Sequence, residues 1–262
     1  MGWNRDGIFS GSAHAAAQLA WRSAGMRRLC PERAAGQYQE HVTMTAGPPD
    51  SPVTEAVRSL EVRWIFPGQL ETAVAGWFGR FPARTESRED TYLLDPPLRG
   101  LSVKIRGGGA LEVKAYRGSP GILEVAGRGC GRLESWQKWS FPFRPPSGAT
   151  GDPPGWTAVR KRRRISSFTL ASGPIVERAA GIGQQPRCEV ELTEVHACGQ
   201  DWWTLGFEAT GPADLLRREL EATVALVFAH ALPGSVEPGP DESRSYAEWL
   251  GQRPDADGDA GA

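Results

Sequence analysis

The sequence predicts a mainly β protein of the α+β class, built on an antiparallel sheet with peripheral helices. Short segments rich in β-branched and aromatic residues recur along the chain, and turns rich in glycine and proline separate them. The 262 residues include 32 glycines and 21 prolines, which implies many turns and argues against an all-helical bundle. In addition, charged residues recur at alternate positions of the predicted strands, so each strand has one ionic and one apolar face.

Each element follows from a local pattern. Residues 60–66 alternate apolar with charged side chains and end at Pro67-Gly68, which is typical of a strand followed by a turn. Apolar residues at helical spacing then predict a short helix over 69–78. Short β-rich segments predict seven further strands, at 91–94, 101–106, 111–116, 134–141, 157–168, 188–195 and 202–209.

Turns and a final helix complete the pattern. The glycine run at 107–109 indicates a hairpin between two strands, and the proline-rich segment 142–154 indicates a loop. Leu216, Leu220 and Val224 recur at four-residue spacing and predict an amphipathic helix over 213–232. One face of that helix is therefore expected to pack on the sheet.

We expect one folded domain with unstructured ends. Residues 1–52 are predicted to be a disordered leader, 53–250 the folded domain and 251–262 an acidic disordered tail. Strand signals begin only after Met44. Met44 is therefore an alternative start, in which case residues 1–43 are not translated, whereas a disordered tail is the other interpretation.

Composition limits the possible partners and compartment. The chain has 30 Lys and Arg against 31 Asp and Glu, a net charge of −1, which excludes a global polycation. Its four cysteines form no CxxC pair, so they indicate neither a zinc knuckle nor a disulfide framework, and we expect a cytoplasmic protein. The longest apolar stretch, 223–232, is too short to cross a bilayer, so no membrane partner is expected.

Charges two positions apart on strand after strand are the most informative feature. The pairs and runs are Glu61/Arg63, Lys104/Arg106, Glu112/Lys114, the basic run 160–164, and Glu189/Glu191. One interpretation is an ordinary sheet with its ionic face in solvent. The other is a barrel with that face inward, which would create a polar tunnel. Its cations would favour a polyanion such as a triphosphate, and its carboxylates would suit Mg²⁺ or Mn²⁺.

The basic run 160–164 divides by strand parity. Lys161 and Arg163 share one face, and Arg160, Arg162 and Arg164 share the other. Parity leaves open which of these two faces would line a tunnel. RNA binding through the whole run is a less favoured alternative.

The ordered series of motifs resembles the CYTH superfamily of triphosphate tunnel metalloenzymes. The matching motifs are Glu61-x-Arg63, Leu101-x-Val103-Lys104-x-Arg106, Leu111-Glu112-x-Lys114, the basic strand near Lys161, Glu189/Glu191, Phe207-Glu208 and Ser245-Tyr246-x-x-x-Leu250. The resemblance covers roughly residues 59–250. It implies a closed eight-stranded antiparallel β-tunnel, as in thiamine triphosphatases, inorganic triphosphatases, class IV adenylyl cyclases and RNA triphosphatases.

The resemblance also implies roles for individual residues. The expected phosphate-binding residues are Arg63, Lys104, Arg106, Lys114, Lys161 and Arg163, and the expected metal-site carboxylates are Glu61, Glu191 and Glu208. Glu112 and Glu189 are expected to line the same tunnel. The chain departs from the family pattern at Ser59 and Gly206, where carboxylates are expected, and at Arg63, where the family has a lysine. An arginine can hold phosphate but cannot act as a general base.

The function that follows is metal-dependent hydrolysis of a triphosphate compound, with Mg²⁺ or Mn²⁺ as cofactor. Inorganic triphosphate, thiamine triphosphate and a nucleoside triphosphate are the candidate small-molecule substrates. The alternative is a non-catalytic phosphate-binding tunnel with a degenerate metal site. Hydrolase and cyclase activities, and the oligomeric state, are left open by the sequence.

Overall fold

The protein was analysed as a computed structural model, which describes residues 56–94, 100–107, 109–125, 127–143, 155–170, 173–175, 186–234 and 236–252. The predicted leader at 1–52 and residues 253–262 of the predicted tail lie outside the described residues, as does most of the predicted loop at 142–154.

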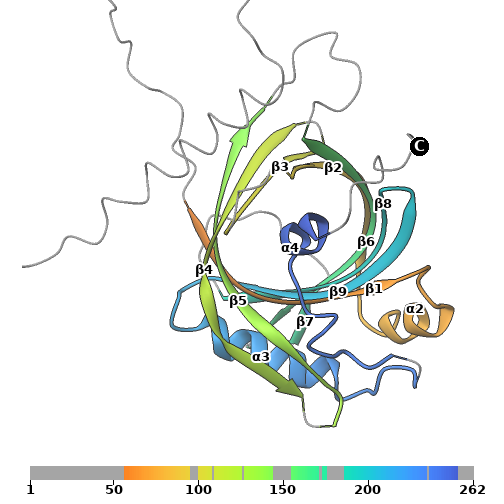
Figure 1. Ribbon diagram of the computed structural model, residues 1–262. Helices are drawn as coiled ribbons and strands as arrows, with labels where there is room; N and C mark the ends of the chain where they lie inside the picture. The colour runs from red at the N-terminus through yellow and green to blue at the C-terminus, as the bar shows by residue number, and fades with distance from the viewer. Residues whose placement is uncertain are drawn as a thin grey trace, which may run out of the picture.

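Eight strands form a closed antiparallel barrel (Figure 1). They are β1 (Val57–Pro67), β2 (Arg84–Leu93), β3 (Leu101–Arg106), β4 (Ala110–Val125), β5 (Gly129–Pro142), β6 (Trp156–Thr169), β8 (Arg187–Ala197) and β9 (Gln200–Thr210). The wall runs in the order β2-β3-β4-β5-β1-β9-β8-β6, and pairing of β2 with β6 closes it. The short strand β7 (Gly173–Ile175) pairs with the end of β6. The prediction of a closed eight-stranded antiparallel tunnel is confirmed.

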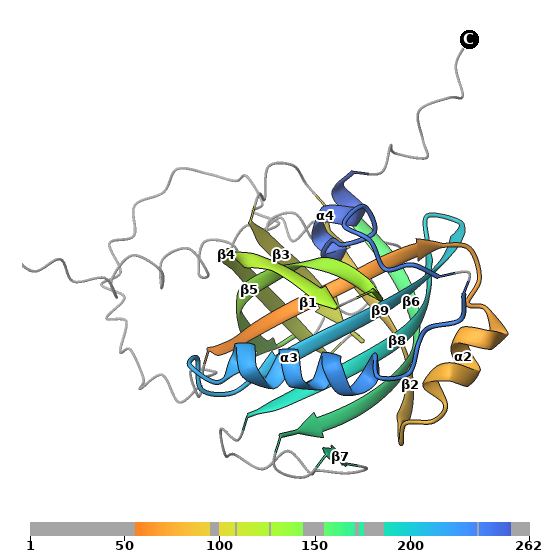
Figure 2. The same ribbon diagram turned by 90° about the horizontal axis from the view of Figure 1, so that it is seen from below.

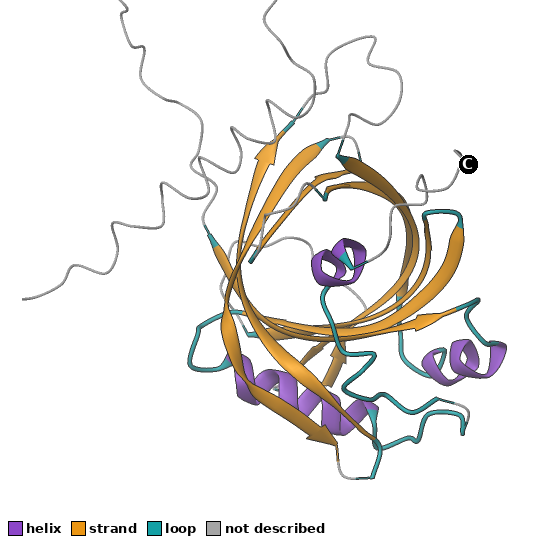
Figure 3. Ribbon diagram, in the orientation of Figure 1, coloured by secondary structure: helices purple, strands orange, loops and turns teal. Residues whose placement is uncertain are grey.

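The helices occupy two kinds of position. Helix α3 (Leu216–Val227) lies across the outer face of β1, β8 and β9, and α2 (Thr72–Phe78) lies beside the barrel (Figure 2). Helix α4 (Tyr246–Gly251) instead lies in one opening of the barrel (Figures 1 and 3). In the described part of the chain, no helix combines the length and apolar character required to cross a membrane.

The main apolar core lies outside the barrel wall. Outward-facing side chains of β1, β8 and β9 pack against α2 and α3. Trp64, for example, is fully buried and contacts Phe207 and Phe228 edge to face. Burial of this outer face leaves the opposite, charged face of the same strands turned toward the interior of the barrel.

The structure corrects several predicted boundaries. Strand β2 begins at Arg84, well before the predicted strand at 91–94, and β4 continues to Val125 instead of ending at residue 116. The pairing of β4 with β5 shifts register around Gly118 and Gly121, so the strand passes through a segment that looks like a turn in the sequence. The helix predicted over 213–232 spans only Leu216–Val227.

Candidate functional site

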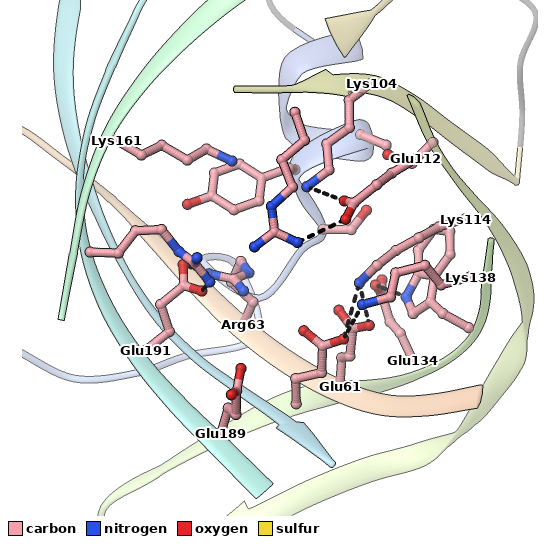
Figure 4. Close-up of a pocket in the computed structure, with 18 of the residues that line it drawn as sticks. Glu61, Arg63, Lys104, Glu112, Lys114, Glu134, Lys138, Lys161, Glu189 and Glu191 are labelled. Atoms are coloured by element: carbon pink, nitrogen blue, oxygen red, sulfur yellow. Dashed lines mark hydrogen bonds and ion pairs between the residues drawn. The ribbon is translucent and has the colours of Figure 1, made fainter. Parts of the chain in front are cut away.

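A single cavity inside the barrel brings the predicted site residues together (Figure 4). Its lining includes all eleven of them: Glu61, Arg63, Lys104, Arg106, Glu112, Lys114, Lys161, Arg163, Glu189, Glu191 and Glu208. Arg160 and Arg162, next to Lys161, are exposed on the outside. The ionic face of the sheet therefore points into an enclosed space, which we call the tunnel.

Further charged side chains reach the tunnel. Arg88, Lys138, Arg187 and Glu134 also line it. The lining then contains nine lysines and arginines and six glutamates. Because cations outnumber carboxylates in a space shielded from bulk water, the tunnel favours an anionic ligand.

Arg63, Arg163 and Glu191 form an arginine cluster at one side of the tunnel. Arg63 Nη1 lies 3.4 Å from Glu191 Oε1, and Arg163 Nη2 donates to Glu191 Oε2. The Thr193 hydroxyl donates to Glu191 Oε1 at 2.6 Å. Burial alone would raise the pKa of Glu191, but the two guanidinium groups outweigh it and hold that pKa well below its usual range.

Lys114, Lys138, Glu61 and Glu208 form a lysine cluster. Lys114 Nζ lies 2.6 Å from Glu61 Oε1 and 3.5 Å from Glu208 Oε1, and Lys138 Nζ lies 3.8 Å from Glu208. The two glutamates are direct cross-strand neighbours on β1 and β9. Burial raises the pKa of Glu208, but Lys114 and Lys138 outweigh it and lower that pKa below its ordinary value.

Asp90, which the sequence analysis did not single out, lies at the centre of a third group of charges. Its fully buried carboxylate lies 3.1 Å from Lys161 Nζ, 3.5 Å from Lys104 Nζ and 3.0 Å from Arg88 Nε. Lys161 also donates to the Tyr92 hydroxyl at 2.7 Å. Burial lowers the pKa of Lys161 well below its ordinary value, and Asp90 only partly opposes this.

Glu112 gives a test of the tunnel's electrostatics. Burial raises its pKa, but Lys104 and Arg106 outweigh this and lower it from 4.5 to about 2. Because the pKa is lower in the folded state, the stabilisation is complete above pH 4.5 and is lost as the pH falls toward 2. We expect Glu112→Gln to lower the free energy of unfolding by about 3 kcal/mol at pH 7.

Urea unfolding measured against pH would check this prediction. The variant should show a flatter loss of stability between pH 4.5 and 2 than the unmodified protein. Glu124→Gln, at an exposed position of the same strand, is the matched control and should leave the curve unchanged. Equal acid sensitivity of the Glu112→Gln variant and the unmodified protein would contradict the assigned ion pairs.

The carboxylates of the tunnel are the groups that could hold a metal ion. Among the residues that the structure describes, no group of three or more His, Cys, Asp or Glu is arranged to hold a metal ion. Glu61 and Glu208, however, share one cation, the Lys114 ammonium. A pair of carboxylates is what Mg²⁺ commonly takes from a protein, with water and phosphate oxygens completing its shell. Glu61 and Glu208 therefore supply oxygen donors of the kind that Mg²⁺ takes, with the Lys114 ammonium lying between them.

Residues missed by sequence reasoning lie mostly on β2 and α4. Arg88 and Asp90 belong to a segment whose residues are polar on both faces, so no alternation marked it as a strand. Lys138 shares parity with Glu134 on β5, a spacing that could have found it. Tyr246 enters the tunnel from α4; the sequence matched it as part of the Ser245-Tyr246-x-x-x-Leu250 motif but gave it no site role, because its side chain carries no charge.

Comparisons with known proteins give only distant structural likeness. No family model matches the chain, and no curated protein matches it. The chain is similar to a structure of S. pombe Pct1 RNA triphosphatase in complex with the Spt5 CTD, with 11% identity and a TM-score of 0.34, over 68% of this chain and 80% of that one. A second structure of S. pombe Pct1 RNA triphosphatase matches with 11% identity and a TM-score of 0.33, over 67% and 79%. Membership of the CYTH superfamily stays a prediction.

Proposed function

We propose that the protein hydrolyses a triphosphate compound inside the tunnel, with Mg²⁺ or Mn²⁺ as its cofactor. The observation that carries the proposal is the arrangement of the barrel: its main apolar core lies outside the wall, and nine lysines and arginines line its interior. A chain of phosphates is the small anion that such a space would hold best, because each group carries charge and several acceptor oxygens. Inorganic triphosphate, thiamine triphosphate and a nucleoside triphosphate are the candidate substrates.

Different cations of the tunnel would have different roles toward the bound phosphates. Arg63 and Arg163 would grip phosphate oxygens without releasing a proton, and Lys104, Arg106, Lys114 and Lys161 would neutralise the remaining charge. Such fixed cations stabilise the charge on a phosphoryl group during its transfer. Enclosure by the barrel wall would exclude bulk water and strengthen each of these contacts.

We place the metal at Glu61 and Glu208, where Lys114 lies between the two carboxylates. A divalent ion bound there would supply charge neutralisation and polarise a phosphoryl oxygen. Glu191, which the family resemblance also implies as a ligand, has Arg63, Arg163 and Thr193 as partners of its two oxygens. We therefore assign Glu191 to holding the two arginines.

A substrate panel crossed with two metals tests the proposal. The full chain should release phosphate from at least one of the candidate triphosphates with Mg²⁺ or Mn²⁺. Glu208→Gln should lower this release at least tenfold, whereas Glu221→Gln, on the outer helix α3, should not. Identification of the products by ³¹P NMR separates hydrolysis from cyclisation. Absence of release from every candidate with both ions would reject the enzymatic proposal.

The second candidate is a tunnel that binds phosphate without turning it over. It is favoured by the finding that, in the described part of the chain, no three His, Cys, Asp or Glu side chains are arranged to hold a metal ion, although Glu189 and Glu134 are the cross-strand neighbours of Glu208 and Glu61. In that case calorimetry would detect binding of inorganic triphosphate, and the panel would show no product. The two experiments together decide between an enzyme and a binding protein.

A further inference from the structure

Gly206 lies at the point where the arginine cluster meets the barrel wall. On β9 it is the direct neighbour of Arg63 on β1 and of Glu191 on β8. A Cβ atom at this glycine would lie only 2.7 Å from Arg63 Cζ, 2.8 Å from Nη2 and 2.9 Å from Nη1. The similar distances to three guanidinium atoms mean that the guanidinium covers the glycine. No side chain could occupy position 206 without moving Arg63.

Tyr246 contacts the same guanidinium from the interior. Its ring centroid lies 4.7 Å from Arg63 Cζ, and its hydroxyl lies 3.2 Å from the Thr204 hydroxyl, which in turn accepts a hydrogen bond from Arg63 Nη1 at 3.0 Å. Tyr246 is carried by α4, the helix in the barrel opening (Figure 1). The guanidinium is therefore held between the wall strand β9 and α4.

One edge of the Arg63 guanidinium is left unused. Its hydrogen bonds to Glu191 and Thr204 both come from Nη1. Within the described ranges, Nη2 has no hydrogen-bond partner. Arg63 nevertheless lines the tunnel, next to Glu191 (Figure 4). A donor that is fixed in place but lacks an acceptor is suited to an incoming phosphate oxygen.

We infer that Gly206 and Tyr246 are positioning residues that hold the Arg63 guanidinium in one orientation, so that its Nη2 edge grips a phosphate group of the substrate. This inference rests on the proposed function, because it assigns that grip to the same tunnel. A guanidinium that is already ordered loses little conformational freedom when it binds, so its fork can add affinity. A side chain at position 206 would remove this preorganisation without removing any charge.

The test measures binding of inorganic triphosphate by calorimetry in EDTA, so that no turnover occurs. Gly206→Ala is expected to weaken binding at least tenfold. The matched control is Gly76→Ala on α2, because a Cβ there meets nothing within 4 Å, and its affinity should stay within twofold of the unmodified protein. Thermal unfolding of both variants is recorded to separate a loss of grip from a loss of fold.

Coupling to Arg63 distinguishes positioning from a structural effect. In an Arg63→Lys background the space over residue 206 is no longer filled by a guanidinium, so adding Gly206→Ala should change affinity less than threefold. Tyr246→Phe keeps the ring and should bind nearly as well as the unmodified protein, whereas Tyr246→Leu should bind about tenfold more weakly. If Gly206→Ala does not fold, the Tyr246 variants decide, and equal binding by Tyr246→Leu and the unmodified protein overturns the inference.

The outcomes separate this inference from the proposed function. No binding of inorganic triphosphate by the unmodified protein would reject the inference, whereas the proposed function is decided separately by the substrate panel with both metals. Binding by the unmodified protein and equally tight binding by a folded Gly206→Ala variant would reject only the positioning roles. An equal loss of affinity from Gly206→Ala with arginine or lysine at position 63 would also reject them.

Discussion

Replacing Glu191 with glutamine is expected to lower the free energy of unfolding by about 3 kcal/mol or more, because it removes the shared counter-ion of two arginines. Neither guanidinium can release its proton to relieve the repulsion. The Arg63 and Arg163 side chains are only 13% and 9% exposed, so water does little to screen them. Denaturant unfolding at pH 7 measures the loss.

A matched control lies on the opposite face of the same strand. Glu194 pairs with Arg162 and Arg164 on the outside of the barrel, where all three side chains are partly exposed. Glu194→Gln should therefore cost less than about 1 kcal/mol. If both variants lose the same free energy of unfolding, the assignment of Glu191 to the buried interior face of β8 and of Glu194 to its exposed outer face is contradicted.

The Glu191→Gln variant should also gain affinity for inorganic triphosphate. Removing one negative charge beside two arginines raises the local positive potential, and a bound anion then restores part of the lost stability by mass action. Loss of both stability and triphosphate binding would contradict this, since it would mean that the variant damages the tunnel as a whole.

The second large effect is expected at Lys161 and concerns the number of protons taken up when a triphosphate binds. Burial lowers the pKa of Lys161 well below the ordinary value, which moves the deprotonation of its ammonium toward lower pH. A triphosphate placed near Nζ would raise that pKa again, so binding should take up protons and weaken as the pH rises. Calorimetry at pH 8 in buffers of different ionisation enthalpy would measure the uptake.

Lys161→Met should abolish most of this proton uptake and weaken triphosphate binding by tenfold to a hundredfold, as expected for loss of a charge-assisted contact. The neighbouring Arg162→Met, on the outer face, is the control and should change neither quantity. A different pair of results would support the RNA-binding interpretation of the basic run. In that case Arg162→Met would weaken binding of single-stranded RNA, and Lys161→Met would leave triphosphate binding unaffected.

Most of the fold could be predicted from the sequence, because segments rich in β-forming residues coincide with segments in which charged and apolar residues alternate. In β3 apolar and polar residues alternate throughout, in β1 they alternate over residues 60–64, and both strands lie where the pattern predicts them. Residues 84–90 carry no such alternation, since the outward-facing side of β2 is also polar there. Their strand is imposed by pairing with β3 and β6, which is a tertiary effect that local sequence does not encode.

The sequence predicted which residues line the site, but not which carboxylate forms an ion pair with which cation. Parity places Glu61, Arg63 and Lys114 on the ionic faces of their strands, and the family resemblance implied that these faces line the interior, as they do. Which carboxylate neutralises which cation depends on the register between strands, and this decides that Glu191 serves two arginines while Glu61 and Glu208 share Lys114. The space over Gly206 is likewise visible only once Arg63 is placed beside it.

The seam between β1 and β9 has a consequence for biosynthesis. It joins residues 59–67 to residues 202–210, so the first strand of the wall acquires one of its two neighbours only after residues 202–210 have been synthesised. At about 5–20 residues per second, the ribosome needs on the order of ten seconds to make the intervening chain. Until then one edge of the nascent strand is open to association with other polypeptides.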